Sequence, residues 1–372
     1  MSRIRAVRSA FPAHRYPQHE LAEAVAAIAD SAGGLRPAQR LLLDRLHANA
    51  EVATRHTALP IGEYAGAGGL LGPGNGRPGA ARANDRYIGE ATALGERALR
   101  TALDRSGVAA ADLDLLIVTS VTGVAVPSLD ALLIPRLGLR PDIKRLPVFG
   151  LGCVAGAAGL ARLHDYLLAW PGQAAALIAV ELCSLTLPSN EVTTADLVAS
   201  ALFGDGAAAL VAVGEQAAVR PATPRPGRTP RVVATRSEVY PDSTDTLGWR
   251  LAAYGFRIVL TAELAEVVER RLGGSVTAFL GDQGLTVDDI SSWICHPGGP
   301  KVLDAAQRAL KLPDSALAAS RRSLSEAGNM SSVSVLHILE LTIDEHAPAP
   351  GSFGLMIGLG PGVSAELLLL RW

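Results

Sequence analysis

Gly107-Val-Ala-Ala-Ala-Asp-Leu-Asp-Leu-Leu-Ile-Val118 decides the fold, because the same pattern returns later as Gly284-Leu-Thr-Val-Asp-Asp-Ile-Ser-Ser-Trp-Ile-Cys295. Each stretch follows a segment with helical periodicity, residues 89–105 and 262–280. Each then runs from a glycine through an aspartate into an apolar strand. A unit of helix, turn and strand that occurs twice indicates an internal repeat.

Two further pairs of motifs lie at nearly the same spacing and in the same order. Gly152-Cys153 matches Gly328-Asn329, and each pair opens a helix of small residues. Phe203-Gly-Asp-Gly206 matches Leu359-Gly-Pro-Gly362, and each opens a strand. Three repeats in one order predict an α/β fold built from two duplicated halves.

We place the two halves at residues 1–225 and 226–372. The Pro/Arg run over residues 220–231 is expected to link them, and residues 65–82 are expected to form a Gly-rich loop. If the halves pack about a pseudo-twofold axis, Cys153 and Asn329 begin equivalent helices near that axis.

Composition excludes several classes of function. The chain has 372 residues, a net charge of −2 and only 4% aromatic residues, so nucleic acid is not an expected partner. Its apolar stretches are too short to span a bilayer, and nothing resembles a signal peptide. Three cysteines are too few for a disulfide framework or a metal cage. We therefore expect a cytoplasmic protein without membrane contact, bound metal or bound cofactor.

Cys153 is the candidate nucleophile. It lies in Phe149-Gly-Leu-Gly-Cys-Val-Ala-Gly156, where the glycines permit a sharp turn from strand to helix. The unpaired N–H groups and the dipole of a helix N-terminus favour a thiolate, which attacks thioesters. The alternative is a small buried apolar side chain, as most lone cysteines are. Cys183 is expected to lie in the core or to line a tunnel.

His296 and Asn329 are candidates for stabilising an oxyanion beside this cysteine. His296 follows the second repeated strand in Cys295-His-Pro-Gly-Gly-Pro300, where it can pair with a thiolate and donate to a thioester carbonyl. Asn329 can donate its amide to the same oxygen. A structural turn for His296 and a helix cap for Asn329 are the alternatives.

Together these residues resemble the type III polyketide synthases of the chalcone synthase superfamily. The resemblance rests on five motifs in order: Gly152-Cys153, Leu202-Phe-Gly-Asp-Gly-Ala207, His296-Pro-Gly-Gly-Pro300, Gly328-Asn-Met-Ser-Ser332 and Gly358-Leu-Gly-Pro-Gly362. It implies a thiolase-like αβαβα five-layer fold, a catalytic triad of Cys153, His296 and Asn329, and a homodimer. It also implies a pantetheine tunnel that admits acyl-CoA and malonyl-CoA, with CoA contacts at Arg45, Arg55, Gly298 and Lys301.

The same resemblance implies which residues contact the substrate: Phe203, Thr122, Val126, Thr186, Trp249, Ile258, Leu359 and Ser331. Phe203 matches the first of two gatekeeping phenylalanines, whereas Ile258 stands at the second. Val126 lies in a loop that crosses the dimer in this family, and Leu359 replaces a usual phenylalanine. Less aromatic bulk at Ile258 and Val126 widens the path for a starter, while Trp249 narrows another direction.

We therefore expect a type III polyketide synthase that extends an acyl-CoA starter, by expectation a fatty acyl group, with malonyl units and cyclises it to a pyrone or resorcinol. A carrier protein is possible but not required. Three alternatives stay open. They are an initiating β-ketoacyl-carrier-protein synthase, a type III synthase that uses only malonyl-CoA, and a non-catalytic chain-length subunit, although such subunits typically lack the nucleophile.

Overall fold

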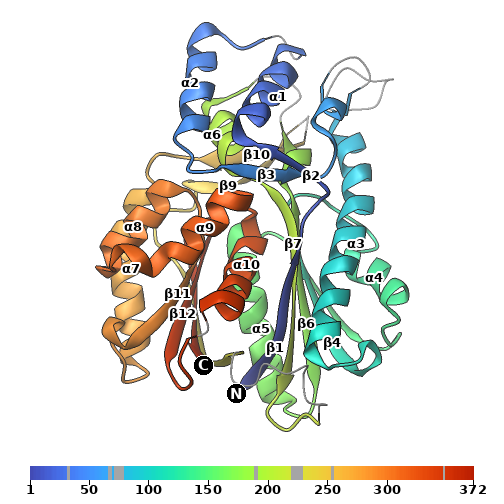
Figure 1. Cartoon of the computed structure of the whole chain (residues 1–372), viewed down its shortest axis with the longest axis vertical. Coiled ribbons are helices and arrows are strands. Elements are labelled where there is room, and N and C mark those ends of the chain that lie inside the picture. The colour runs from blue at the N-terminus through green and yellow to red at the C-terminus, as the bar shows by residue number, and fades with distance from the viewer. Residues whose placement is uncertain are drawn as a thin grey trace.

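A long mixed sheet organises the chain. The structure is a computed structural model that describes residues 1–31, 34–65, 69–70, 79–187, 192–218, 229–252, 255–346 and 348–372. Within these residues nine strands form one sheet (Figure 1). In sheet order they are β11 (Ile290–Cys295), β12 (Phe353–Gly360), β13 (Ser364–Arg371), β8 (Arg231–Val239), β1 (Ser2–Ala10), β7 (Asp205–Gly214), β6 (Ala174–Leu182), β4 (Leu113–Thr119) and β5 (Lys144–Val148).

The strand pairing confirms the predicted duplication. Outward from the central β1–β8 contact, β1 pairs antiparallel with β7, β7 antiparallel with β6, and β6 parallel with β4. On the other side β8 pairs antiparallel with β13, β13 antiparallel with β12, and β12 parallel with β11. The stretches at Gly107 and Gly284 each contribute a helix end, one 3-10 turn and a strand, β4 or β11.

Helices cover both faces of each half and give five layers. The middle layer is α5 (Ala155–Ala169) with α10 (Ser334–Leu341), whose apolar residues pack against the inner faces of both halves. One outer layer contains α3 (Gly79–Ser106) and α4 (Leu129–Leu137), and the other contains α7 (Leu264–Gly281), α8 (Pro300–Leu310) and α9 (Ala318–Ala327). The predicted αβαβα fold is therefore confirmed.

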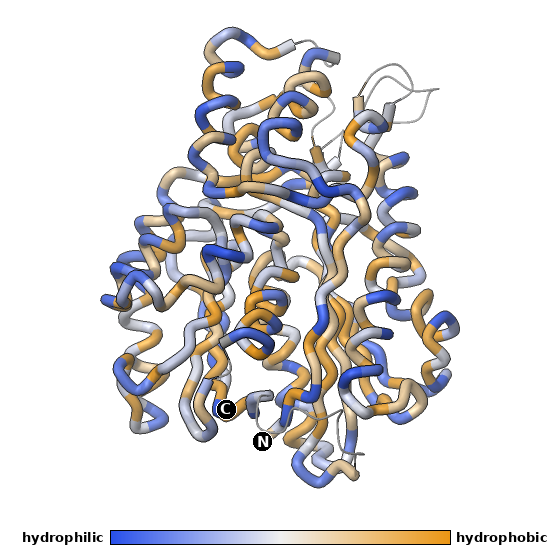
Figure 2. Tube along the Cα trace, viewed as in Figure 1, coloured by the Kyte–Doolittle hydropathy of each residue, from blue (hydrophilic) through white to orange (hydrophobic). Residues whose placement is uncertain are grey.

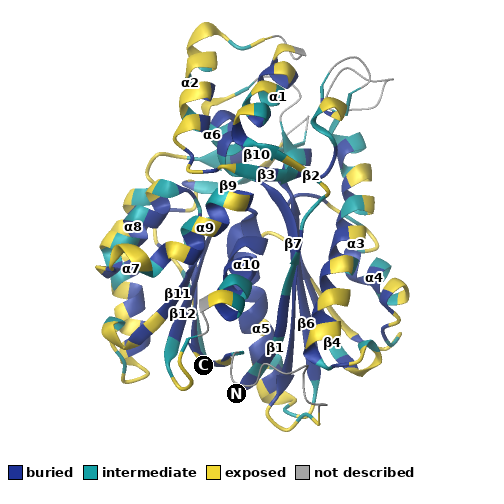
Figure 3. Cartoon of the chain, viewed as in Figure 1, coloured by how far each residue is buried: buried dark blue, intermediate teal, exposed yellow. Residues whose placement is uncertain are grey.

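Burial explains the apolar runs of the sequence. β6 and β7 are buried along their whole length because helices lie on both of their faces, so their side chains need not alternate with polar ones. Figure 2 shows these strands and the middle helices as the most hydrophobic part of the chain, and Figure 3 shows them buried. None of the described helices is long and apolar enough to cross a membrane.

A cap of smaller elements lies over the end of the sheet away from the chain termini (Figure 1). Its helices and strands are α1 (Gln18–Ser31), α2 (Pro37–Ala48), α6 (Thr194–Leu202), β2 (His14–Pro17), β3 (Thr54–Thr57), β9 (Leu247–Ala252) and β10 (Gly255–Leu260). Two short turns contact the cap, η1 (Ile61–Glu63) at α1 and η4 (Cys183–Thr186) at β10. The other short turns are η2 (Ala110–Asp112), η3 (Gly152–Val154), η5 (Val287–Asp289), η6 (Asp314–Leu317), η7 (Ser331–Val333) and η8 (Thr342–His346).

Two predicted loops fall partly outside the described residues. The Gly-rich loop was expected to end at residue 82, but α3 already begins at Gly79, and residues 66–68 and 71–78 are not described. The linker at 220–231 and the boundary at 225/226 lie almost wholly outside the described residues, since β8 begins at Arg231. The boundary therefore stays a prediction.

Candidate active site

The helix starts that carry Cys153 and Asn329 meet at the centre of the molecule. Cys153 lies in η3, directly before α5, and η7 follows Asn329 directly before α10. The two turns are in close contact: a Cβ at Gly156 would lie 2.0 Å from the carbonyl oxygen of Ser332. A residue other than glycine at 156 would therefore push the two helix starts apart.

Each turn of the duplicated pair packs against the helix start of the opposite half. Phe203 forms a β-bridge with Asn329, and the Gly204 amide donates to the Asn329 carbonyl at 3.0 Å. In the second half, Pro361 lies against Gly152, whose φ of +55° favours glycine. The repeat read from the sequence thus positions Cys153 and Asn329 reciprocally.

His296 is brought to the same region by β12. Its backbone N–H donates to the carbonyl of Ile357 at 2.9 Å, and the next residue of β12, Gly358, lies against Val154 beside Cys153. The His296 side chain is only 2% exposed, and its Nδ1 has no hydrogen-bond partner among the described residues. Burial lowers the pKa of His296 to about 3, so the imidazole is neutral and can accept a proton.

The Asn329 side chain joins η7 to the loop that follows His296. Its Oδ1 accepts the backbone N–H of Ser331 at 2.8 Å, and its Nδ2 donates to the carbonyl of Gly298 at 3.4 Å. The first bond fixes the amide orientation, with the NH2 group directed to the His296 side. Because the second bond is long, the amide can turn its N–H to a substrate oxygen at small cost.

Cys153 is a neutral thiol in this environment. Burial raises its pKa to about 12, hydrogen bonding with Ser331 lowers it, and the charge of Glu181 raises it. The expectation that the helix N-terminus would favour a thiolate is therefore wrong for the free protein. Removal of the thiol from water outweighs the helix dipole, whose effect is typically about 0.3–1 kcal/mol and reaches about 2 kcal/mol.

Glu181 is a site residue that the sequence reasoning missed. It is fully buried at the end of β6 and accepts the Val121 N–H at 3.1 Å, the Thr122 hydroxyl at 2.9 Å and the Ser332 hydroxyl at 2.6 Å. Burial raises its pKa to about 7, while these hydrogen bonds lower it. The available signal was a lone acidic residue within an apolar strand.

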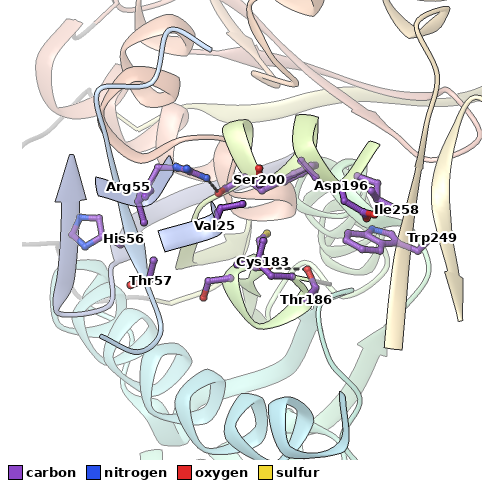
Figure 4. A pocket seen from close by; sticks show the side chains of 15 residues that line it. Val25, Arg55, His56, Thr57, Cys183, Thr186, Asp196, Ser200, Trp249 and Ile258 are labelled. Atoms are coloured by element: carbon purple, nitrogen blue, oxygen red, sulfur yellow. Dashed lines mark hydrogen bonds between the residues drawn. The ribbon is translucent and has the colours of Figure 1, made fainter. Parts of the chain in front are cut away.

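A narrow pocket of about 60 Å³ lies beneath the cap (Figure 4). Four of the predicted substrate contacts line it: Phe203, Thr186, Trp249 and Ile258. Cys183 also lines it and is close enough to Cys153 that a negative charge on Cys153 raises the pKa of Cys183. Trp249 on β9 is paired directly with Ile258 on β10, so the two side chains lie side by side on one face of the strand pair. The Trp249 ring packs edge-on against Phe256.

The other predicted substrate contacts lie elsewhere. Thr122 and Ser331 are buried in the hydrogen-bond network around Glu181 rather than in the pocket wall. Leu359 is buried in the outer core with α7 and α8, because β12 turns Gly358 and Leu359 to opposite faces. Val126 is 93% exposed and does not line the pocket that contains Trp249 and Ile258. We do not retain Leu359 as a substrate contact, nor Val126 as a contact within one chain.

The predicted CoA contacts lie in different environments, one buried and two exposed. Arg55 is buried, donates through Nη1 to the Phe203 carbonyl at 2.6 Å and through Nε to Gln18 at 3.0 Å, and lines the pocket. These bonds use its guanidinium to hold β3 against α6, so we withdraw Arg55 as a CoA phosphate contact. Arg45 is exposed on α2, and Lys301 is exposed in the first turn of α8, next to Gly298.

Comparisons with known proteins cover the whole chain. The chalcone and stilbene synthase N-terminal domain matches residues 1–216, and the C-terminal domain of the same family matches residues 231–372. A 1,3,6,8-tetrahydroxynaphthalene synthase of Streptomyces peucetius subsp. caesius is 52% identical over 369 residues, covering 99% of this chain and 93% of that protein. A phloroglucinol synthase of Pseudomonas fluorescens is 30% identical and covers 97% of both chains.

Among solved structures, the 1,3,6,8-tetrahydroxynaphthalene synthase of Streptomyces coelicolor A3(2), a bacterial type III polyketide synthase, has a TM-score of 0.87. It is 30% identical, and the match covers 100% of this chain and 99% of that one.

Proposed function

Because the chain belongs to the chalcone and stilbene synthase family and is a type III polyketide synthase, we propose that it builds a pentaketide from malonyl-CoA alone. The proposed product is 1,3,6,8-tetrahydroxynaphthalene, the compound named in its 52% identical relative. The carbon skeleton and alternating oxygens of that compound correspond to five two-carbon units, so each of the five malonyl groups, including the one first loaded on Cys153, loses its carboxyl as CO2. One ring closes by an aldol step that loses water, and the other by a Claisen step that releases CoA.

The 52% identical relative is the observation that carries the choice of starter, because the compound in its name corresponds to five malonyl-derived units. The pocket beside Trp249 and Ile258 measures about 60 Å³ without substrate, so it must widen for a growing pentaketide as well as for a fatty acyl chain. The fatty acyl starter expected from the sequence rested on reduced side-chain bulk at Ile258 and Val126. In the folded chain Ile258 is paired with Trp249 across β9 and β10, and both residues line the pocket.

Loading of Cys153 begins with a proton transfer. The buried thiol gives its proton to neutral His296, and the resulting thiolate attacks the carbonyl carbon of the malonyl thioester. The tetrahedral intermediate then expels CoA as its thiolate, which takes the proton back from His296. The low pKa of His296 and the high pKa of Cys153 keep both groups neutral before the substrate arrives, so the transfer is uphill in the free protein and is proposed to occur together with attack on the thioester.

Extension requires a donor for the developing enolate. When a second malonyl thioester loses CO2, negative charge collects on the thioester oxygen. The Asn329 amide and a His296 N–H are the proposed donors to that oxygen. The enolate carbon attacks the acyl group on Cys153, and the Cys153 thiolate leaves. Asn329 supports this role because its amide is oriented toward the His296 loop by Ser331 and Gly298.

We further propose that the chain acts as a homodimer and that Arg45 and Lys301 contact CoA phosphates. Support for the dimer is the exposed edge strand β5 together with exposed apolar residues nearby in sequence, namely Val126, Leu146 and Phe149. The Val126 loop would then meet the partner subunit rather than its own pocket.

The test supplies purified protein with malonyl-CoA alone and identifies the products by mass spectrometry. The expected product is 1,3,6,8-tetrahydroxynaphthalene or its oxidised quinone, and Cys153→Ala is expected to form none. A product that appears only after dodecanoyl-CoA is added would favour the fatty acyl starter instead. A single condensation that requires an acyl carrier protein would overturn the polyketide proposal in favour of a β-ketoacyl-carrier-protein synthase.

A further inference from the structure

A small apolar crevice lies directly behind the pocket. It measures about 10 Å³ and is enclosed by α1, α6 and the flanks of residues 187 and 192. Its apolar walls are Val25, Ile28, Ala29, Leu187, Val192 and Leu197. Four residues line both spaces, and two of them, Asp196 and Ser200, are polar. The pocket and the crevice are therefore separated by one layer of side chains.

Asp196 is the charged member of that layer. It is buried on α6, and its Oδ2 accepts the Arg257 Nη2 at 2.7 Å, the Thr193 N–H at 2.8 Å and the Thr193 hydroxyl at 2.6 Å. In Figure 4, Asp196 and Ser200 lie on one side of the pocket, while Cys183 and Thr186 lie on the opposite side. Asp196 thus lies between the pocket and the apolar crevice.

The ion pair also fixes the wall that carries Trp249 and Ile258. Arg257 is on β10, so its bond to Asp196 ties the β9–β10 pair to α6. An aliphatic chain that moved into the crevice would have to displace Arg257 or lie against the carboxylate. Both are unfavourable, since a buried charge that loses its partner is strongly penalised.

We propose that Asp196, held by Arg257, determines the length of the acyl group by closing the pocket to the apolar crevice between α1 and α6. This inference rests on the proposed function, because it explains how the same pocket is kept short. The ligand class that the crevice would admit, once open, is an unbranched aliphatic acyl group. Asp196 is a specificity residue here and takes no part in bond making.

The test removes both charges at once, with Asp196→Ala and Arg257→Ala, so that neither is left unpaired. Wild type and double variant are supplied with malonyl-CoA and a series of acyl-CoA starters from acetyl to dodecanoyl. For each protein, kcat/KM for a longer starter is divided by the malonyl-only rate of the same protein. We expect this ratio to be higher in the double variant than in wild type. The rise should be about fourfold for each methylene that enters the crevice.

Two further variants keep the test decisive. Ala29→Leu fills the crevice and should abolish the gain when added to the double variant. Val25→Ala removes no charge, so it remains informative if the double variant does not fold, and should show a smaller gain in the same direction. The matched control is Arg8→Ala with Glu340→Ala, a partly buried ion pair that lines neither space, and it should leave the length profile unchanged.

Identical length profiles for wild type, the folded double variant and Val25→Ala would overturn the inference. So would a gain that persists after Ala29→Leu. Failure of the proposed function would instead appear as an absent polyketide when wild type receives malonyl-CoA alone, so the two failures are distinguishable.

Discussion

Glu181→Gln should make the stability of the protein less sensitive to pH. Glu181 is fully buried, and its pKa is raised from 4.5 to about 7 by burial. A carboxyl group whose folded pKa exceeds its unfolded value stabilises the fold while it is protonated. That contribution is complete below about pH 4.5 and is lost as the pH rises through about 7.

The magnitude follows from the two pKa values. Between pH 5 and pH 8 the titration of Glu181 removes about 2.5 kcal/mol from the free energy of unfolding of wild type. Glutamine keeps the shape, can accept the Val121 N–H and does not titrate. Apart from a constant offset for altered hydrogen bonds to Thr122 and Ser332, the variant should gain about 2.5 kcal/mol on wild type over this range.

The assay is urea unfolding of both proteins at pH 5, 6, 7 and 8. Glu269→Gln is the control, because Glu269 is an exposed partner of Arg308 and its pKa is lowered rather than raised. The free energy of unfolding of Glu269→Gln should not rise relative to wild type as the pH increases. A stability difference between wild type and Glu181→Gln that stays constant from pH 5 to pH 8 would refute the reasoning.

A second readout concerns the nucleophile itself. The charge of Glu181 raises the pKa of Cys153, so its removal should ease formation of the thiolate. The rate of Cys153 alkylation by iodoacetamide, followed by mass spectrometry of the modified peptide, should therefore rise at lower pH in Glu181→Gln than in wild type. Parallel profiles would show that the two groups do not interact.

Three other predictions concern separate parts of the protein. Gly156→Ala should cost about 1–3 kcal/mol in urea unfolding and abolish condensation, since its Cβ would lie 2.0 Å from the Ser332 oxygen, whereas Gly172→Ala meets nothing within 4 Å and should be neutral. Trp249→Gly should lengthen the products seen by mass spectrometry, while Leu359→Phe, in the outer core, should lower stability without changing product length. Leu146→Asp on the exposed β5 edge should yield a monomer in light scattering; an intact dimer would exclude that edge as the interface.

The repeat predicted the fold well because duplication fixes strand order as well as strand position. Once the stretches at Gly107 and Gly284 are equated, the remaining motifs specify which strands and helix starts are equivalent, and the sheet carries them in mirrored order. The contact between the starts of α5 and α10 follows from the same pairing and from the small residues after Cys153.

Side-chain directions could not be predicted in this way. Leu359 was expected to contact substrate because it lies in a motif beside the site, but strand alternation turns it to the outer core. Arg55 was expected to contact CoA, yet the Phe203 carbonyl and Gln18, both distant in sequence, hold it in the interior. Such outcomes depend on long-range partners, and the same holds for the pKa of Cys153, which is dominated by burial.

The reciprocal packing of the halves explains why neither can form the site alone. Phe203, which opens β7 in the first half, bridges to Asn329 in the second, while Pro361 of the second half supports Gly152 in the first. A shift of one half relative to the other would therefore move Cys153 and Asn329 at the same time. The two helix starts share their geometry but differ in chemistry, with a thiol on one and an amide on the other. A symmetric duplication thereby gives an asymmetric site in which the proposed nucleophile and the proposed oxyanion donor face each other.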